Sequence, residues 1–366
     1  MKSLVKCFNM KVYYIGNLYD GCYQVRCLLP QIHNCWNGSE ISLFSPKKTN
    51  EQIFVEAMMS DVIVFQRPME KEKVEVVRLL KEAGKKVVFD NDDTYKPNSG
   101  VPTNMERVNA KIGKKLVEMN SNIEKFIKQA DLVTTTTEFL AKEYRKLNKN
   151  VIVLPNQIDP FNYEEPIKNT GDKIRVGLVG SVSSNDEYLH ILDALDYLKA
   201  RDDVEIVVFG LPDKDDARLV NMRKIYQKEL AFWEKYADER KPFVSMANYY
   251  ETLNNLRLDL MLIPRQESYF NKCKSNIKFL EASMFEIPVI AQGFSKGDSP
   301  YDKDLDGKNG FIVKTGESWI PTIKKLLDDK KLREKTGKIA KKYVLKHYNI
   351  EDNYKRWEKA YKTLYK

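Results

Sequence analysis

Histidine and cysteine are both scarce in this sequence of 366 residues, which contains only three histidines and five cysteines. So few histidines argue against a His-rich metal site and against a Ser-His-Asp triad. The number of cysteines is odd and no pair has C-x-x-C spacing, which argues against a disulfide framework or a structural zinc site. The cysteines are Cys7, Cys22, Cys27, Cys35 and Cys273. Reduced thiols in a cytoplasmic protein fit this usage better.

Long apolar runs are also missing. No stretch approaches the ~20 residues that a bilayer span needs. The first nine residues, MKSLVKCFN, lack the apolar segment of a secretory signal. Hydrophobic residues make up 42% and charged residues 31%, an ordinary globular mixture that excludes a disordered chain. The length favours two α/β domains over one. We therefore expect a cytoplasmic protein of two domains.

The net charge of +9 is confined to one end of the chain. Residues 320–366 contain 15 Lys and Arg but only 6 Asp and Glu, whereas the remaining residues carry 46 of each sign. One interpretation is a solvated helix face. The other is attraction to an anionic membrane surface, a phosphorylated acceptor or nucleic acid. The sequence leaves both open, so the protein is expected in the cytoplasm, either free or peripheral at a membrane.

Short apolar β-type runs alternate with amphipathic helical stretches along the first part of the chain. Strands are expected at 11–16, 61–66, 85–90, 131–136 and 151–156. Helices are expected at 70–84, where a glycine ends the pattern, and at 138–148. Strands that alternate with helices are joined by right-handed crossovers, so this order predicts a doubly wound parallel sheet. We expect the segment 94–122, with two prolines and a glycine, to be a mobile loop.

A second series of the same kind follows a stretch rich in Pro, Asn and acidic residues. Its strands are expected at 174–180, 204–210, 258–264, 287–292 and 310–313, and its helices at 187–200, 217–237, 249–257 and 275–285. The prediction is an α/β protein of two Rossmann-like domains that face a cleft. The first domain spans 1–160, a linker spans 161–172, and the second domain spans 173–345. A C-terminal helix at 346–366 returns to the first domain, against which its aromatic stripe (Tyr354, Trp357, Tyr361 and Leu364) is expected to pack.

The most informative stretch for chemistry is 270-FNKCKSNIKFLEASMFEIPVIA-291. Lys272, Lys274 and Ser275 precede a helix on which Lys278 and Glu281 are three residues apart and share one face. Lysines and a serine near a helix N-terminus suit a phosphate group. The alternative is a surface helix capped by serine, with solvated lysines. Taken alone, this stretch does not decide between the two.

In combination, several stretches resemble the group 1, or family 4, glycosyltransferases of GT-B fold. The Lys-Ser-x-x-Lys-x-x-Glu core of 274–281 is similar to the donor motif of one branch of that family. The segment 177-GLVGSVSSNDEYLHILDAL-195 resembles the Gly-Ser loop that opens its second domain, and 306-DGKNGFIV-313 resembles its closing Asp-Gly-x-x-Gly. The similarity extends from about residue 10 to the end of the chain and is most specific over 130–320.

The resemblance implies a nucleotide-sugar donor, a first domain that binds the acceptor and a second that binds the donor. Lys272, Lys274, Ser275 and Lys278 would hold the donor diphosphate, with Lys278 acting in catalysis, and Glu281 would bind ribose or sugar hydroxyls. Gly180 and Ser181 would offer backbone N–H groups. Retention of configuration and independence of metals and other cofactors are further implications. Two family features are missing: Cys273 stands where many members have the first glutamate of a Glu-x7-Glu pair, and no Arg or Lys follows the glycine loop.

Acidic residues follow the third expected strand, in 87-VVFDNDDTYKPNSG-100. Asp90, Asp92 and Asp93 would repel one another, so we expect a raised pKa or a cation nearby. We assign all three to acceptor binding and Asp90 and Asp93 also to catalysis. A helix cap, an acidic turn and a Mg²⁺ site stay open as alternatives. Two residues after the first strand join the acceptor-binding set, Gly21 and Arg26, and a surface salt bridge is the alternative for the arginine.

The function expected from these observations is transfer of a sugar from a nucleotide-diphosphate sugar (UDP or GDP) to an acceptor. That acceptor could be a saccharide, a lipid-linked saccharide, a protein or a modified nucleic-acid base, in polysaccharide or glycoconjugate biosynthesis. Two other classes stay open. One is another GT-B-like enzyme, such as a sugar-nucleotide epimerase or a phosphorylase. The other is a non-catalytic module that binds a nucleotide-sugar or nucleic acid.

Overall fold

The computed structural model describes residues 10–17, 20–36, 41–42, 50–97, 110–180, 187–211 and 223–365. The chain divides into two compact units. Unit 1 consists of Met1–Thr94, Val117–Gln157 and Ile350–Lys366, and unit 2 of Tyr95–Leu116 and Ile158–Asn349. The expected linker at 161–172 is part of unit 2: Tyr163 packs against Tyr250 and Phe285 there, with ring centroids 4.5 and 5.3 Å away.

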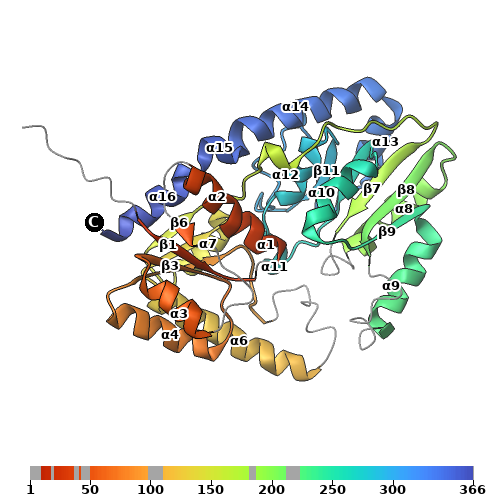
Figure 1. The fold of residues 1–366 in the computed structure, drawn as a ribbon. Helices are drawn as coiled ribbons and strands as arrows, with labels where there is room; N and C mark the ends of the chain where they lie inside the picture. The colour runs from red at the N-terminus through yellow and green to blue at the C-terminus, as the bar shows by residue number, and fades with distance from the viewer. Residues whose placement is uncertain are drawn as a thin grey trace, which may run out of the picture. The chain divides into compact units, whose positions relative to one another are not determined.

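Unit 1 is built on a parallel sheet with helices on both sides (Figure 1). Its strands, in spatial order, are β2 (Ile41–Ser42), β1 (Val12–Ile15), β3 (Val62–Gln66), β4 (Lys86–Asn91), β5 (Leu132–Thr135) and β6 (Val151–Val153). Its helices are α1 (Gly21–Tyr23), a π-helix at Gln24–Leu28, α2 (Leu29–Trp36), α3 (Asn50–Met58), α4 (Lys71–Glu82), α6 (Ala110–Gln129), whose first residues belong to unit 2, and α7 (Glu138–Tyr144). The chain reverses its direction across the sheet between β1 and β3, which places a topological switch point there.

Unit 2 repeats this plan with a second parallel sheet. Its spatial order is β12 (Phe311–Lys314), β11 (Val289–Gly293), β10 (Leu260–Ile263), β7 (Ile174–Val179), β8 (Val204–Leu211) and β9 (Glu239–Pro242). Its helices are a 3-10 helix at Glu187–Ile191, α8 (Leu192–Lys199), α9 (Arg223–Tyr236), α10 (Met246–Asn255), α11 (Tyr269–Cys273), α12 (Ile277–Met284), α13 (Ile320–Asp328) and α14 (Lys330–Tyr348). Here the switch point lies between β7 and β10. The predicted fold of two doubly wound α/β domains is confirmed.

Both faces of the second sheet are buried, as helices on either side of a parallel sheet require. Alternate residues of β8 belong to two separate hydrophobic clusters. Val207 and Phe209 pack in one with α12 and α14, whereas Ile206 and Val208 pack in the other with α8 and α13. This period of two explains why the strands read as continuous apolar runs in the sequence.

The segment 94–122 is not a loop throughout, as we had expected, because α6 begins at Ala110. Leu116, Met119, Ile123 and Phe126 recur at spacings of three and four on this helix, and all four are buried. That amphipathic pattern is typical of a helix packed on a core. The residues before Ala110, from position 98, lie outside the described part of the chain.

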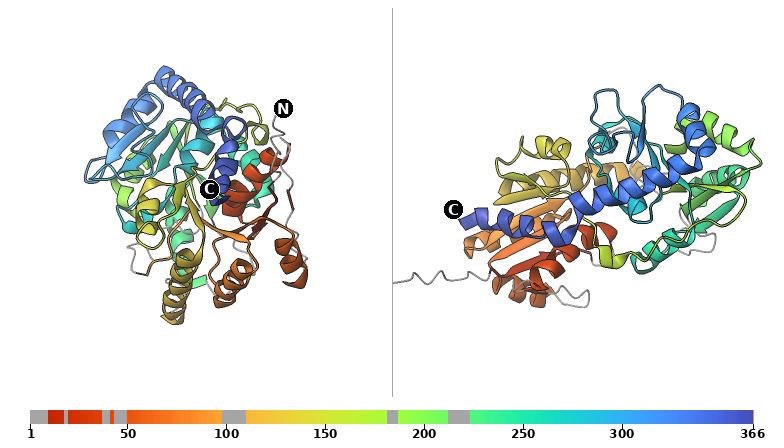
Figure 2. Two further views of the ribbon diagram at one scale, coloured as in Figure 1. Left: turned by 90° about the vertical axis from the view of Figure 1, so that its left-hand side faces the viewer. Right: turned by 90° about the horizontal axis from the view of Figure 1, so that it is seen from above.

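The end of the chain returns to unit 1, as expected. Helices α15 (Ile350–Asn353) and α16 (Lys355–Lys362) follow α14 (Figure 2). Trp357 and Tyr361 are buried in one cluster with residues of β1 and β3, and the hydroxyls of Tyr14 and Tyr361 are 3.3 Å apart. No helix in the described part of the chain combines the length and the apolar character needed to cross a membrane.

Candidate functional site

The first candidate site lies within unit 2, at the carboxyl ends of β7, β8 and β10. Gly180 follows β7, and its N–H donates to the carbonyl of Phe209 at 3.0 Å. Gly210 has a φ of +100°, and a Cβ there would lie 1.6 Å from the carbonyl oxygen of Gly180. Only glycine fits this position, because both the left-handed backbone and the close approach exclude a side chain. The two glycines therefore keep this edge of the sheet open.

A small pocket that is partly open to solvent lies at this edge, beside the switch point of the second sheet. It is lined by both glycines, by Lys278 and by the side chains of four residues that sequence analysis had not selected: Glu187, Tyr188, Glu229 and Trp233. A crevice outside the carboxyl ends of parallel strands is where open α/β sheets bind ligands. Ser181, expected beside Gly180, lies outside the described residues.

Helix α12 brings Lys278 and Glu281 together, as their spacing of three predicts. Burial and the neighbouring Arg265 cation lower the pKa of Lys278 to about 7, although Glu187 and Glu281 act in the opposite direction. Burial also raises the pKa of Glu281 to about 7, while a 3.0 Å hydrogen bond from the Tyr249 hydroxyl and the charge of Lys278 lower it. The lysine and the carboxylate thus both titrate near neutral pH. A bound anion would raise the pKa of Lys278 and strongly favour its charged form.

The other lysines of the motif are placed differently. The ammonium of Lys272 pairs with Glu267 at 3.1 Å and with Asp298 at 2.9 Å, so two carboxylates already balance its charge. This pairing argues against the phosphate-binding role expected for Lys272. Lys274 ends α11, and its ammonium lies 4.2 Å from the ring centroid of Phe270. Ser275 lies between α11 and α12, and Asn276 rather than Ser275 is the N-cap residue of α12.

Sequence analysis missed three buried charged residues of this site, Glu187, Glu229 and Arg265, and two of them lie close together. Glu187 begins the 3-10 helix after the glycine loop, and its carboxylate accepts hydrogen bonds from the N–H of Gln266 and the side-chain amide of Asn271. Arg265, two residues after β10, lies 3.7 Å from the same carboxylate and is 6% exposed. The place of Arg265 in the sequence could have indicated its role, because this residue follows a strand at the switch point of the sheet.

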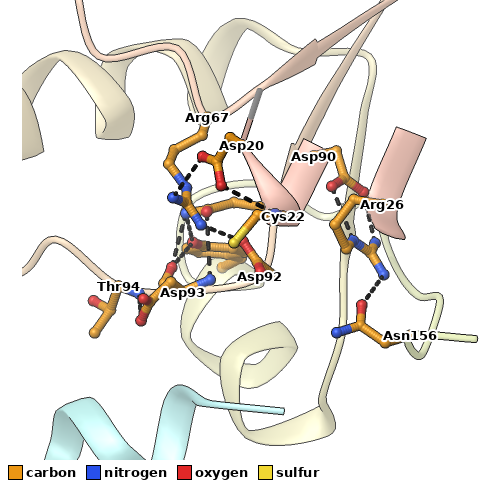
Figure 3. A network of polar contacts seen from close by, with 11 residues as sticks. Asp20, Cys22, Arg26, Arg67, Asp90, Asp92, Asp93, Thr94 and Asn156 are labelled. Atoms are coloured by element: carbon orange, nitrogen blue, oxygen red, sulfur yellow. Dashed lines mark hydrogen bonds and ion pairs between the residues drawn. The ribbon is translucent and has the colours of Figure 1, made fainter. Parts of the chain in front are cut away.

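The acidic stretch begins at the end of β4 in unit 1, and arginines pair with two of its three carboxylates (Figure 3). Arg26 forms a two-pronged pair with Asp90, at 3.0 Å from Nε to Oδ1 and 2.6 Å from Nη2 to Oδ2. Asp90 also accepts from the Thr134 hydroxyl, and Arg26 donates to the carbonyl of Leu154 and to Asn156. The side chains of the pair are 0% and 2% exposed.

This burial argues against the roles that we expected for the pair. The charges of Arg26 and Asp90 are not available to a ligand, because the two buried side chains pair with each other in the core. The π-helix after α1 turns Arg26 inward, and the sequence carried no sign of that direction. We therefore interpret the pair as part of the framework of unit 1 and not as an acceptor-binding or catalytic group.

Asp92 and Asp93 lie closer to the surface, at the carboxyl edge of the first sheet. Asp92 pairs with Arg67 at 2.6 Å, and Arg67 reaches Asp20 at 3.5 Å. Burial raises the pKa of Asp92, but the charges of Arg67 and Arg26 and the hydrogen bonds from Arg67 and Cys22 together outweigh burial, and the pKa falls to about 2. The cation that we expected near these acids is thus an arginine. Asp93 accepts a hydrogen bond from the backbone N–H of Thr94 at 2.7 Å.

Arg67 is a further residue that sequence analysis missed. It follows β3, next to β1 at the switch point of the first sheet, and has a φ of +52°, a left-handed conformation that few arginines adopt. Gly21 begins α1 on the other side of this point, where Asp20 caps the helix by accepting from the N–H of Cys22. Such strained positions often cluster at ligand sites. In the described part of the chain, no three His, Cys, Asp or Glu side chains are arranged to hold a metal ion.

No protein-family model matches the chain, and no curated protein matches its sequence. Solved structures do share its fold. HepE from Anabaena, in complex with UDP-glucose, is 12% identical with a TM-score of 0.66 over 97% of this chain and 100% of that one. Sucrose-phosphate synthase from Thermosynechococcus elongatus is 12% identical with a TM-score of 0.67 over 97% and 99%. A glycosyltransferase from Rickettsia africae is 13% identical with a TM-score of 0.63 over 98% of each chain. The chain therefore has the GT-B fold of these glycosyltransferases.

Proposed function

We propose that this protein is a glycosyltransferase that moves a sugar from a nucleotide-diphosphate sugar to an acceptor. One observation carries the proposal: a lysine with a lowered pKa, Lys278, lines a pocket at the switch point of the second sheet, beside the open glycine edge of β7 and β8. The fold supports it, since HepE, which shares that fold, was solved with UDP-glucose and with UDP. We accordingly expect a UDP-sugar first among donors, with a GDP-sugar as the next choice.

In this proposal the donor diphosphate binds in unit 2. Lys278, Lys274 and Ser275 hold the phosphate oxygens, and Gly180, whose own N–H donates to Phe209, leaves room for them at the end of β7. Glu281, on the same face of α12 as Lys278, accepts hydrogen bonds from ribose or sugar hydroxyls. As the glycosidic bond breaks, negative charge grows on the leaving diphosphate, and a nearby cation stabilises that charge most when it is fixed in advance.

Buried charge also explains why a metal ion is dispensable in this proposal. Arg265 and Lys278 influence each other electrostatically, so the site already holds two cations near the expected phosphates. Their mutual repulsion lowers the pKa of Lys278 in the free protein, and a bound diphosphate would relieve it. We propose a metal-independent reaction that retains the configuration of the sugar, in which a departing phosphate oxygen takes the acceptor proton.

The acceptor would bind to unit 1. Asp92, Asp93 and the backbone around Gly21 offer hydrogen-bond acceptors and donors at the carboxyl edge of the first sheet, and Arg67 fixes Asp92 in its ionised form. Hydroxyl groups are the chemistry that such carboxylates bind. A saccharide, free or linked to a lipid, fits this edge, and we propose glycoconjugate or polysaccharide synthesis as its setting. The free thiols of Cys22 and Cys27 agree with a reducing, cytoplasmic location.

A thermal-shift screen tests the donor part of the proposal. UDP, GDP, ADP, CMP and their sugars are compared, because a ligand that binds the folded state raises its melting temperature. We expect UDP and a UDP-sugar to raise it, and Lys278→Ala to abolish the shift. Lys303→Ala, an exposed lysine of unit 2, is the control and should leave the shift unchanged. If no nucleotide shifts the wild type, the proposal fails. Binding without sugar transfer to any acceptor would instead favour a non-catalytic module.

A further inference from the structure

The outer face of α14 carries a row of lysines that the proposed reaction does not use. Lys331, Lys335, Lys338, Lys342 and Lys346 follow one another at spacings of four, three, four and four. At 3.6 residues a turn these spacings keep all five on one side of the helix, and at 1.5 Å a residue the row is about 22 Å long. All five are exposed. We refer to these residues as the lysine face.

The opposite side of α14 is the one that packs. Arg333, Ala340 and Val344 are buried there, and the helix contacts α12 and α13. Figure 1 shows α14 along the outside of unit 2, and the view from above in Figure 2 shows it in front of the other elements of that unit. The lysine face therefore points away from the unit to which it belongs.

In the part of the chain that the structure describes, no carboxylate neutralises the lysine face at close range. Among the described residues, none of its five ammonium groups has a carboxylate within 4.0 Å, whereas Lys168, Lys199 and Lys324 of the same unit each have one. The helix contains a single acidic residue, Glu334, which lies 4.0 Å from Lys330. At the edge of the face, Lys338 does help to lower the pKa of Glu286.

This arrangement costs the helix stability. Lys331 and Lys335, Lys338 and Lys342, and Lys342 and Lys346 are like charges four residues apart, a spacing at which repulsion weakens a helix, whereas an alternation of Glu and Lys would strengthen it. No packing contact compensates, because the side chains are exposed. The five positive charges of the lysine face therefore do not stabilise the fold. Such a row of like charges indicates a binding partner with negative charge.

We propose that the lysine face binds a negatively charged lipid surface. The ammonium groups lie in a straight row along one side of the helix and are carried on flexible side chains. Several of them can therefore contact the anionic headgroups of a flat membrane at the same time. The face contains no arginine for two-pronged phosphate recognition and no exposed aromatic ring for stacking on bases, the groups on which specific nucleic-acid binding depends. It also has no large apolar side chain to insert, so binding is electrostatic and sensitive to salt. This inference does not depend on the proposed reaction.

Sedimentation with vesicles tests the proposal. The full-length protein is mixed with vesicles of phosphatidylcholine alone or with an equal part of phosphatidylglycerol, at low and at physiological salt. We expect binding to the anionic vesicles only, and weaker binding as salt is added. Replacement of Lys335, Lys338 and Lys342 by serine should weaken binding by about 100-fold, since each lysine near such a surface contributes roughly a factor of five.

The matched control replaces three exposed lysines of unit 2 outside α14, Lys296, Lys303 and Lys308, by serine. It has the same net charge as the test variant and should bind as the wild type does. The melting temperatures of both variants, with and without UDP, show whether unit 2 stays folded. The proposal is overturned if the wild type ignores anionic vesicles at low salt, if both variants lose binding equally, or if heparin or a DNA duplex binds the lysine face more tightly than the vesicles do.

Discussion

The carboxylate of Glu187 accepts a hydrogen bond from the side-chain amide of Asn271 at 2.8 Å, and it joins two segments 84 residues apart. Glu187 follows the glycine loop after β7, whereas Asn271 lies in α11, just before the lysines of the donor motif. The amide of Asn271 also donates to the carbonyl of Gln266, so the loop after β10 is fixed at both ends. Glu187 thus positions the segment that leads to Lys274 and Lys278.

Glu187→Gln tests this positioning role. The substitution keeps the size of the side chain but places an NH₂ group against one of two N–H donors, leaving a buried donor unsatisfied. We expect a loss of about 1–3 kcal/mol in the free energy of unfolding, together with weaker donor binding. Chemical denaturation and calorimetry with UDP measure the two effects. Glu251→Gln, on the exposed face of α10, should change neither. Reduced stability with unchanged donor affinity would limit Glu187 to the fold.

Most of the fold could be predicted because its signals are local. In the described part of the chain, ten strands are largely apolar runs, eight of them interior and two (β6 and β12) at sheet edges, and each was expected within about three residues of its observed position. The two strands that were missed are edge strands: β2 has only two residues, and β9 has the sequence ERKP, which is mostly exposed and charged. Charged residues protect an exposed edge from pairing with other chains, and for that reason they remove the apolar signal of a strand.

The candidate site could be predicted only where its residues are close in sequence. Lys278 and Glu281 are one helical turn apart, so their shared face follows from spacing alone. Arg67 and Glu187 acquire their importance from partners in distant segments, and no local pattern indicates those partners. Arg26 and Asp90 were assigned to a ligand because both follow strands, but only the structure reveals that the two side chains face each other in the core.

The lowered pKa of Lys278 predicts a trade-off between stability and function. In the unfolded chain this lysine keeps its proton up to its ordinary pKa of 10.5, whereas in the folded protein it loses the proton near pH 7. The buried charge of Lys278 therefore lowers the free energy of unfolding most below pH 7. This loss decreases as the pH rises from 7 to 10.5. We expect Lys278→Met to raise the melting temperature of the free protein more at pH 6 than at pH 9, and to abolish donor binding at both. An equal gain at the two pH values would contradict the lowered pKa.

Glu281 predicts a pH dependence of opposite sign. Its folded pKa of about 7 lies above the ordinary 4.5, so the folded state holds a proton that the unfolded state has lost. Stability due to this group is present below pH 4.5 and is lost as the pH rises to 7. Glu281→Gln should therefore stabilise the free protein more at pH 8 than at pH 5, as thermal melts can measure. In calorimetry the same variant should weaken the binding of a nucleotide-sugar more than that of the nucleotide alone.

The pair of Arg26 and Asp90 predicts a loss of stability where a catalytic role would predict a loss of turnover. Asp90→Asn leaves the Arg26 guanidinium buried without its counter-charge, at a cost of about 3–5 kcal/mol. The double variant Arg26→Met with Asp90→Leu removes both charges and should recover much of that loss. Urea denaturation measures the free energies of unfolding. Asp93→Asn, nearer the surface, is the control and should cost far less. A stable but inactive Asp90→Asn variant would restore the catalytic assignment.

The C-terminal helix predicts that unit 1 depends on the last residues of the chain for its stability. Trp357 is fully buried in the cluster that contains Tyr14 and Val64, so Trp357→Ala should cost about 3–5 kcal/mol through the cavity that it creates. Trp357→Phe should cost much less, because it keeps an aromatic ring and removes an indole N–H that has no hydrogen-bond partner among the described residues. Arg356→Ala, at the exposed neighbouring position, is the control. Since unit 2 holds the candidate donor site, Trp357→Ala should lower the first unfolding transition in calorimetry yet leave the thermal shift by UDP in place. Loss of both together would mean that the two units unfold as one.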